Sequence, residues 1–165
     1  FALPIVAVLH RGPTHDTLLS SLLAGRCRLA VKEADDQEPL RPGVVYVAPP
    51  DYHVLVELER SLSLSVDCKV RFSRPSIDVL FETAADAFRE GLVGILLTGA
   101  NDDGTAGLLH IRRRGGLTVV QDPCEAESDL MPRAAIEAGA AQHVMKLTRI
   151  ASLLEEIGGG RMVNG

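Results

Sequence analysis

The alternation of short apolar runs with amphipathic segments in the second half of the chain is the feature that most restricts the fold. Strand-like runs cover residues 93–98, 117–121 and 143–145, and helix-like segments cover residues 104–113, 132–138 and 148–157. The runs are continuously apolar, which is typical of strands covered on both faces. This alternation predicts an α/β fold with a mostly parallel, doubly wound sheet and right-handed crossovers.

The first half of the chain is less regular. Residues 5–9 form another continuous apolar run, and Thr14 can cap a helix that Gly25 ends. Four leucines fall on one face of this helix. They are Leu18, Leu19, Leu22 and Leu23. Residues 27–31 then predict a further strand.

Three adjacent strand-like runs occupy the middle of the chain. They cover residues 44–47, 53–56 and 62–66, with turn residues between them. Adjacent short strands predict an antiparallel meander or hairpin inserted beside the parallel sheet. After them, Ser76 and Asp78 suit the N-terminus of a helix that runs to about residue 90.

The length of 165 residues fits one domain. We expect this domain to cover residues 1–157 and to be followed by a flexible tail, residues 158–165, which starts with three glycines. A central strand seldom opens a domain, so we also expect the domain to be N-terminally incomplete.

Composition and charge exclude several classes of function. The chain has 17 Lys and Arg against 22 Asp and Glu, a net charge of −5, no Trp and 4% aromatic residues, which argues against nucleic-acid binding. No apolar run is long enough to cross a membrane and no leader segment is visible, so we expect a soluble, cytoplasmic protein without direct membrane insertion. The three cysteines form no CxxC pair, and we interpret them as free, buried thiols.

Two loops are placed where an open parallel sheet collects its ligands, at the carboxyl ends of strands. His10 follows the first strand, where a neutral imidazole can act as a general base. In the loop of residues 98–104, Asp102 or Asp103 could orient a histidine. Gly99 and Gly104 permit a tight backbone path, and the exposed amides of the following helix could hold an oxyanion. A surface histidine and an aspartate that caps a helix remain the simpler interpretations.

Base and acid are two members of a hydrolase triad, but a nucleophile is not obvious. No serine lies in a GxSxG turn, Ser76 is better explained as a helix cap, and the four other histidines have no better context than a structural one. They are His15, His53, His110 and His143. A nucleotide-binding α/β protein is a third possibility, after a hydrolase and a partner-binding protein. The glycines of the second loop give it little support, because they match neither GxGxxG nor a P-loop.

Four segments of the chain contain motifs of several residues each. Residues 97–107 read LTGANDDGTAG, similar to LTGMGxDGAxG. Residues 41–49 read RPGVVYVAP, residues 74–81 read RPSIDVLF and residues 131–140 read MPRAAIEAGA, similar to PGxxYxAP, RPSVDVLF and MPREAIxxGA. With these motifs in the expected order, the chain resembles the chemotaxis protein-glutamate methylesterases, the CheB catalytic domain.

The resemblance implies a serine hydrolase on a parallel α/β sheet. Such an enzyme removes methyl esters from glutamate side chains of chemoreceptors and deamidates particular receptor glutamines. By position, His10 matches the catalytic histidine, Asp103 matches the triad acid, and Gly99 and Ala100 fall where substrate or an oxyanion would bind. The resemblance implies no metal and no organic cofactor. It implies the methylated cytoplasmic segment of a chemoreceptor as partner and leaves a receiver domain open.

The chain also departs from the family. The family's serine lies in a GASTGG-like turn upstream of the histidine, whereas residues 1–9 contain no serine, and Ala100–Asn101 replaces Met–Gly. One interpretation is that the upstream turn belongs to the native protein and is absent from this sequence. The other is a non-catalytic relative that binds a receptor or another partner, with the arginines at 112–114 as a docking patch. Whether the chain is an enzyme therefore stays open.

Overall fold

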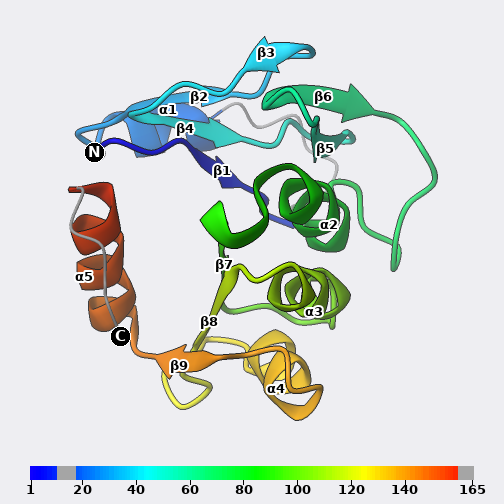
Figure 1. The fold of residues 1–165 in the computed structure, drawn as a ribbon, viewed down its shortest axis with the longest axis vertical. Helices are drawn as coiled ribbons and strands as arrows, with labels where there is room; N and C mark the ends of the chain where they lie inside the picture. The colour runs from blue at the N-terminus through cyan, green and yellow to red at the C-terminus, as the bar shows by residue number, and fades with distance from the viewer. Residues whose placement is uncertain (11–17, 160–165) are drawn as a thin grey trace.

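The computed structural model describes residues 1–10 and 18–159, which form three three-stranded sheets with helices around them (Figure 1). The first sheet is parallel, with β1 (Ile5–Ala7) and β2 (Ala30–Glu33) on either side of β4 (Val44–Val47). The predicted strand at residues 5–9 is present, and the one predicted at 27–31 begins and ends later.

The second sheet is antiparallel. In it β6 (Ser61–Ser65) lies between β5 (His53–Val56) and the short strand β3 (Glu38–Pro39). The prediction of an antiparallel hairpin is confirmed for β5 and β6, but it is wrong for residues 44–47. Those residues form β4 in the parallel sheet, because a continuous Val-Val-Tyr-Val run suits a central strand whose two faces are covered.

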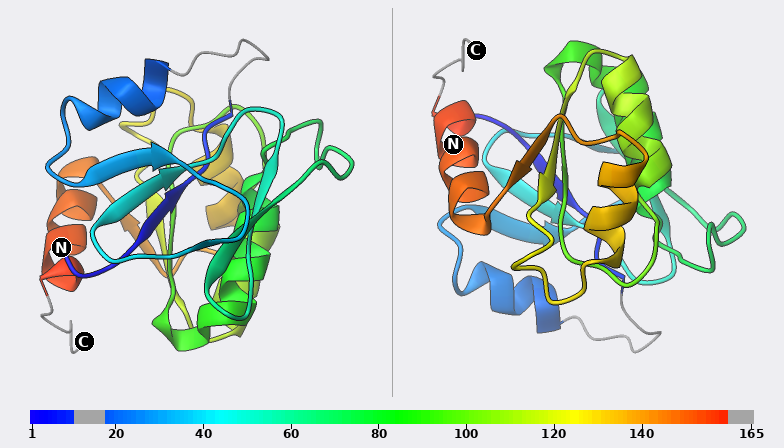
Figure 2. Two further views of the ribbon diagram at one scale, coloured as in Figure 1. Left: turned by 90° about the horizontal axis from the view of Figure 1, so that it is seen from above. Right: turned by 90° about the horizontal axis from the view of Figure 1, so that it is seen from below.

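The third sheet is parallel and has helices on both faces. Its order is β7 (Val93–Leu96), β8 (Leu117–Gln121), β9 (His143–Met145). In β8, Val120 packs with α3 (Thr105–Arg113) and α4 (Leu130–Glu137), whereas Val119 packs with α5 (Leu147–Gly158). Figure 2 shows α5 on one side of this sheet and α3 and α4 on the other. The mostly parallel, doubly wound α/β arrangement predicted from the sequence is confirmed.

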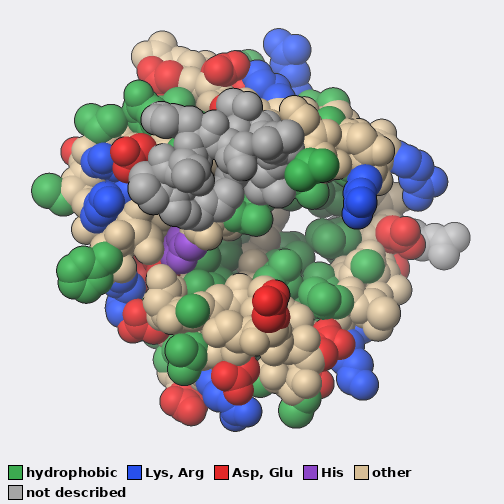
Figure 3. All heavy atoms as spheres, turned by 180° about the vertical axis from the view of Figure 1, so that it is seen from behind, with side chains coloured by type: hydrophobic (Ala, Val, Ile, Leu, Met, Phe, Trp, Pro, Cys, Tyr) green, Lys and Arg blue, Asp and Glu red, His purple; other side chains and the backbone are tan. Residues whose placement is uncertain are grey.

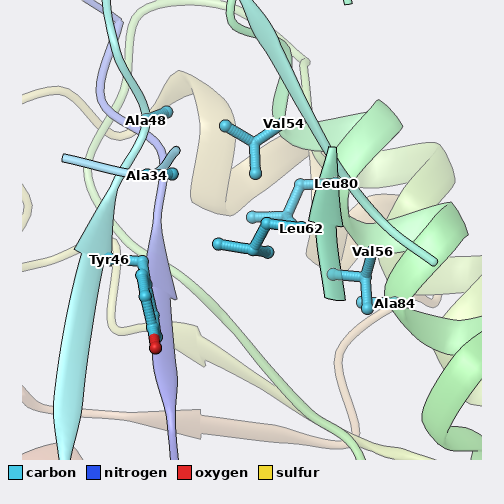
Figure 4. Packing of buried hydrophobic residues seen from close by; sticks show 8 residues of the cluster. All are labelled: Ala34, Tyr46, Ala48, Val54, Val56, Leu62, Leu80 and Ala84. Carbon is cyan, nitrogen blue, oxygen red and sulfur yellow. The ribbon is translucent and has the colours of Figure 1, made fainter. Parts of the chain in front are cut away.

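The helix α2 (Ile77–Phe88) joins the hairpin to the rest of the fold and continues into the 3-10 turn η1 (Arg89–Gly91). One face of α2, with Leu80 and Ala84, packs against Tyr46 of β4 and against apolar side chains of β5 and β6 (Figure 4). Its other face packs on α3 through Ala85 and Leu108. The helix predicted from Ser76 is therefore confirmed, and it fixes the position of the loops before and after it.

Two expectations about apolar and thiol groups are wrong. The helix α1 (Leu18–Ala24) exists, but Leu22 and Leu23 are exposed on it. All three cysteines are exposed, because each lies in a turn or loop just after a helix or strand. Thr14 and most of the expected tail, residues 160–165, lie outside the described residues, and residue 158 is the last residue of α5. No described helix has the length and hydrophobicity to span a membrane.

The close packing of α2 on α3 requires a glycine at position 107. A Cβ atom there would lie 2.5 Å from Cβ of Phe81 and 3.1 Å from the carbonyl oxygen of Asp78. We expect Gly107→Ala to lower the free energy of unfolding by about 1–3 kcal/mol, because overpacking outweighs the gain of up to about 1 kcal/mol in helix propensity. Urea unfolding measures this. Gly91→Ala is the control, since nothing lies within 4 Å of its added Cβ. Equal stability of Gly107→Ala and wild type would contradict the packing argument.

Candidate active site

The two strand-end loops singled out in the sequence meet in the structure. His10 follows β1, and Asp103 precedes Gly104, the residue that caps α3. The ring nitrogen Nε2 of His10 lies 2.7 Å from Oδ2 of Asp103. The histidine side chain is 25% exposed and the aspartate side chain is 0% exposed. A buried acid therefore holds a histidine whose ring still reaches the surface.

Asp103 is held by the N-terminus of α2 as well as by His10. Its Oδ1 accepts hydrogen bonds from the Ser76 hydroxyl at 2.8 Å and from the Asp78 amide at 3.0 Å, and its Oδ2 accepts one from the Ile77 amide at 2.7 Å. Burial acts to raise the pKa of Asp103, but the hydrogen bonds from His10, these two amides and Ser76 lower it below its ordinary value. The carboxylate is therefore held in its charged form, beside the positive end of a helix.

Asp78 makes the reciprocal contact: it lies in α2 and binds the N-terminus of α3. Its Oδ1 accepts hydrogen bonds from the amides of Gly104 at 2.9 Å and Gly107 at 2.7 Å, at the start of α3. Each aspartate thus binds the N-terminus of the other's helix. Burial and the nearby charge of Asp103 raise the pKa of Asp78, although the two amides and Arg71 oppose this.

The glycine after Asp103 is required by its backbone conformation. Gly104 has φ +96°, in the left-handed region, and a Cβ atom there would lie 2.7 Å from Leu96 and 2.8 Å from Ile77. The Asp–Gly pair in the sequence motif therefore has a physical cause: the aspartate must point at α2 while the chain turns into α3 without a side chain.

The opposite pKa shifts of the two aspartates predict opposite pH dependences of stability. The lowered pKa of Asp103 means that its stabilisation is present above the ordinary pKa and is lost as pH falls through the lower folded value. The raised pKa of Asp78 means that its penalty at neutral pH disappears as pH falls through the higher folded value.

We expect the stability advantage of wild type over Asp103→Asn to shrink on acidification, and that of wild type over Asp78→Asn to grow. Urea unfolding from about pH 6 to about pH 3 measures both differences. Two differences that change with the same sign would contradict the assigned pKa shifts.

The second ring nitrogen of His10 faces Asn101, a residue that the sequence analysis did not single out. Nδ2 of Asn101 lies 3.3 Å from Nδ1 of His10, and Oδ1 of Asn101 accepts a hydrogen bond from the Asp103 amide at 3.1 Å. This assignment makes Nδ1 the acceptor, so Nε2 carries the proton donated to Asp103. The basic nitrogen of His10 is therefore Nδ1. Only the position of Asn101 in the loop of residues 98–104 could have pointed to it.

The predicted oxyanion residues are placed less favourably. The Gly99 amide donates to the Ser128 carbonyl at 3.1 Å, and the Gly99 carbonyl accepts from the Met131 amide at 3.0 Å. The amide of Gly99 is therefore already engaged in joining its loop to α4, whereas Ala100 is exposed. Ala100 is therefore the more accessible of the two predicted residues.

The buried His53 holds Ser76 of the candidate site in place. It is 1% exposed, its Nδ1 accepts a hydrogen bond from the Ser76 amide at 3.2 Å, and its Nε2 donates to the Cys68 carbonyl at 3.1 Å. It therefore fixes the residue whose hydroxyl binds Asp103. The sequence interpretation of His53 as structural was incomplete, because its partners come from distant parts of the chain.

The arginines at 112–114 are largely engaged within the fold. Arg112 donates to the Gly139 carbonyl, and Arg114 lies 2.6 Å from Asp86, which also binds His110 at 2.9 Å. These contacts weaken the interpretation of the run as a docking patch. Within residues 1–10 and 18–159, no three His, Cys, Asp or Glu side chains are grouped to hold a metal ion.

One face of the molecule is hollowed and apolar. Figure 3 shows a hollow with hydrophobic side chains around it on the face behind that of Figure 1, and histidine atoms are visible on the same face. The leucines that follow β1 and β7, Leu9 and Leu97, are 39% and 41% exposed.

Comparison with known proteins shows the family of the chain. Residues 1–154 match the family model described as CheB methylesterase. A protein of Leptospira interrogans is 50% identical over 153 residues, 93% of this chain and 79% of that protein. The Geobacter sulfurreducens protein-glutamate methylesterase/protein-glutamine glutaminase 1 is 36% identical over 161 residues, 94% of this chain and 44% of that protein.

A solved structure is also similar. The CheB methylesterase catalytic domain of Thermotoga maritima superposes with a TM-score of 0.90 at 32% sequence identity, and the match covers 95% of this chain and 85% of that domain. The family model and the solved structure thus each match almost the whole chain. The chain belongs to the CheB methylesterase family.

Proposed function

We propose that the chain is part of a serine-type carboxylic ester hydrolase that removes methyl groups from glutamate side chains of chemoreceptors. Membership of the family and the names of its relatives give the reaction class. The observation that carries the proposal for this chain is the 2.7 Å hydrogen bond between His10 and the buried Asp103.

In the proposed mechanism His10 is the general base and Asp103 orients it. The nucleophile is the serine that the family resemblance implies. It takes the place of the Asn101 amide at Nδ1 of His10, because Nε2 is bound to Asp103. Nδ1 takes the serine proton while the serine oxygen attacks the γ-carbonyl of the methylated glutamate. The charge of Asp103 stabilises the imidazolium that forms.

The acyl-enzyme then forms and breaks with the same groups. His10 returns the proton to the departing methoxide, which leaves as methanol. Water, activated by Nδ1, hydrolyses the acyl-serine and leaves a free carboxylate. With a glutamine side chain, ammonia leaves in place of methanol, which gives the second proposed activity, deamidation. The amide near Ala100 is our candidate for oxyanion stabilisation.

The proposed partner follows from the substrate. It is the cytoplasmic segment of a chemoreceptor that carries the methylated glutamates, which places the activity in the cytoplasm. The resemblance leaves open whether the protein also has a receiver domain.

Methanol release from a methylated receptor fragment tests the proposal. The complete gene product is incubated with a chemoreceptor cytoplasmic fragment that carries radiolabelled methyl esters, and volatile label is counted. We expect release that depends on protein concentration, and none from the same fragment labelled by N-methylation of lysine. Binding of the fragment without methanol release would favour the non-catalytic alternative. A nucleotide-induced rise in melting temperature would favour nucleotide binding.

A further inference from the structure

The loop between β6 and α2 is held firmly although it projects from the fold (Figure 1). The guanidinium of Arg74 donates to the carbonyl of Val66 at 2.7 Å and to that of Asp67 at 3.0 Å, and it lies 3.4 Å from Asp51. The buried His53 donates to the Cys68 carbonyl. Several hydrogen bonds thus fix the base of a loop that contributes nothing to the cores.

The tip of this loop is a tight turn with an unusual sequence. Val70 and Ser73 exchange two backbone hydrogen bonds of 3.1 and 2.8 Å, and the two residues between them, Arg71 and Phe72, have φ +48° and +65°. This is the pattern of a type I′ turn, which is normally built from Asn–Gly or Asp–Gly because side chains disfavour the left-handed region. The backbone is therefore strained at both Arg71 and Phe72.

What this turn displays is an aromatic ring. Phe72 is 97% exposed, the highest exposure among the large hydrophobic residues of the described chain. Its ring contributes no burial to folding, and glycine or asparagine would make the turn with less strain. Strain that folding does not require is typical of functional positions.

The turn is also joined to the candidate active site. Arg71 forms an ion pair with Asp102, and its Nε lies 3.4 Å from Oδ2 of Asp78. Asp102 adjoins Asp103, which binds His10. The charge of Arg71 is therefore satisfied by carboxylates next to the candidate site, and Phe72 is the exposed side chain of a turn that is joined to that site.

We propose that Phe72 is a docking residue for the protein substrate. It packs against an apolar side chain of the receptor segment next to the methylated glutamate, while the ester reaches His10. The inference rests on the proposed function and extends it: it assigns a residue that lets this site bind a protein segment rather than a free ester. A flexible segment gains affinity from a rigid aromatic anchor because little entropy is lost on the protein side.

Phe72→Gly distinguishes a docking role from a folding role, because glycine should stabilise the fold but weaken substrate binding. Glycine relieves the left-handed strain, so the melting temperature should rise by about 2–4 °C. Loss of the ring should raise KM for the methylated receptor fragment about tenfold, with kcat within about twofold of wild type. A purely structural role for Phe72 would instead lower the melting temperature and leave KM unchanged, and that result would overturn the inference.

Leu58→Gly is the matched control. Leu58 is 71% exposed, in the turn at the other end of the β5–β6 hairpin. It should leave KM at its wild-type value. Phe72→Leu, which keeps an apolar side chain, should recover part of the affinity. An equal rise of KM in Leu58→Gly and Phe72→Gly would show a nonspecific surface effect and would overturn the assignment.

A binding measurement distinguishes failure of this inference from failure of the proposed function. Fluorescein-labelled receptor fragment is titrated with His10→Ala protein and with His10→Ala/Phe72→Gly protein, so no turnover is needed. About tenfold weaker binding of the double variant supports docking even if no methanol release is found. If wild type demethylates the fragment normally and both variants bind it equally, the docking role of Phe72 is overturned and the proposed function stands. If Phe72→Gly instead changes only the sedimentation coefficient of the protein, the turn contacts a second copy, which also overturns it.

Discussion

His10→Ala is expected to lower kcat for methanol release from the methylated receptor fragment by at least about 10³-fold. The reason is that Nδ1 of His10 is the only group that the proposed mechanism uses to accept the nucleophile's proton and to return it to methoxide. The readout is single-turnover release of labelled methanol by the complete gene product, which isolates the chemical step from substrate binding.

The substitution should leave the fold intact. The His10 ring is partly exposed, and Asp103 keeps its three other donors, Ser76, Ile77 and Asp78. Loss of one hydrogen bond to a charged group lowers the free energy of unfolding by about 1.5–3 kcal/mol. His143→Ala removes an exposed histidine of β9 and is the control, with wild-type kcat expected. Undiminished methanol release by His10→Ala would refute the assignment of the base.

The candidate pair was predictable from the sequence because both residues follow apolar strands. Ligand-binding loops collect at the carboxyl ends of parallel strands, which is why both residues could be selected from the sequence. The strands β1 and β7 lie in two different sheets, and the packing of these sheets brings His10 and Asp103 to 2.7 Å. The motif around Asp103 then selected it over Asp102. In the structure Asp102 forms an ion pair with Arg71, whereas Asp103 contacts His10.

The groups that support this pair were not predictable in the same way. Ser76 was identified correctly as a helix cap, but the same hydroxyl also binds Asp103, and His53 carries no pattern that distinguishes it from a loop histidine. Both roles depend on how α2 packs on α3 and on the hairpin. Periodicity gives the buried face of a helix but not which residue of another segment meets its first turn.

Strand pairing shows the same limit. Local spacing predicts that the run of β4 pairs with its neighbours in sequence, as in a hairpin. In the structure Val45 lies opposite Ile5 and Val31, which are both strand residues far from it in the chain. Apolar continuity could have separated β4 from β5, since Tyr46 and Val47 are fully buried, but no local signal names the partner strands.

Asp103→Asn and Asp103→Ala are expected to abolish most of the activity alike, and to differ strongly in stability. Both should lower kcat by about 10⁴-fold, because neither side chain can hold the imidazole in the required tautomer and stabilise its charge. Asparagine keeps one acceptor oxygen for the amides of α2. Alanine leaves the Ser76 hydroxyl and the Ile77 and Asp78 amides buried without an acceptor, which should lower the free energy of unfolding by about 3–5 kcal/mol.

The order of stability therefore tests the structure separately from the chemistry. Urea unfolding should rank wild type above Asp103→Asn and Asp103→Asn above Asp103→Ala, with equal activity losses in the two variants. Asp35→Asn is the matched control, because Asp35 is an exposed partner of Lys32 and its loss should change stability by less than about 1 kcal/mol. If Asp103→Ala were as stable as Asp35→Asn, the carboxylate could not be holding the first turn of α2. The buried acid would then lose its structural reason to be charged beside His10.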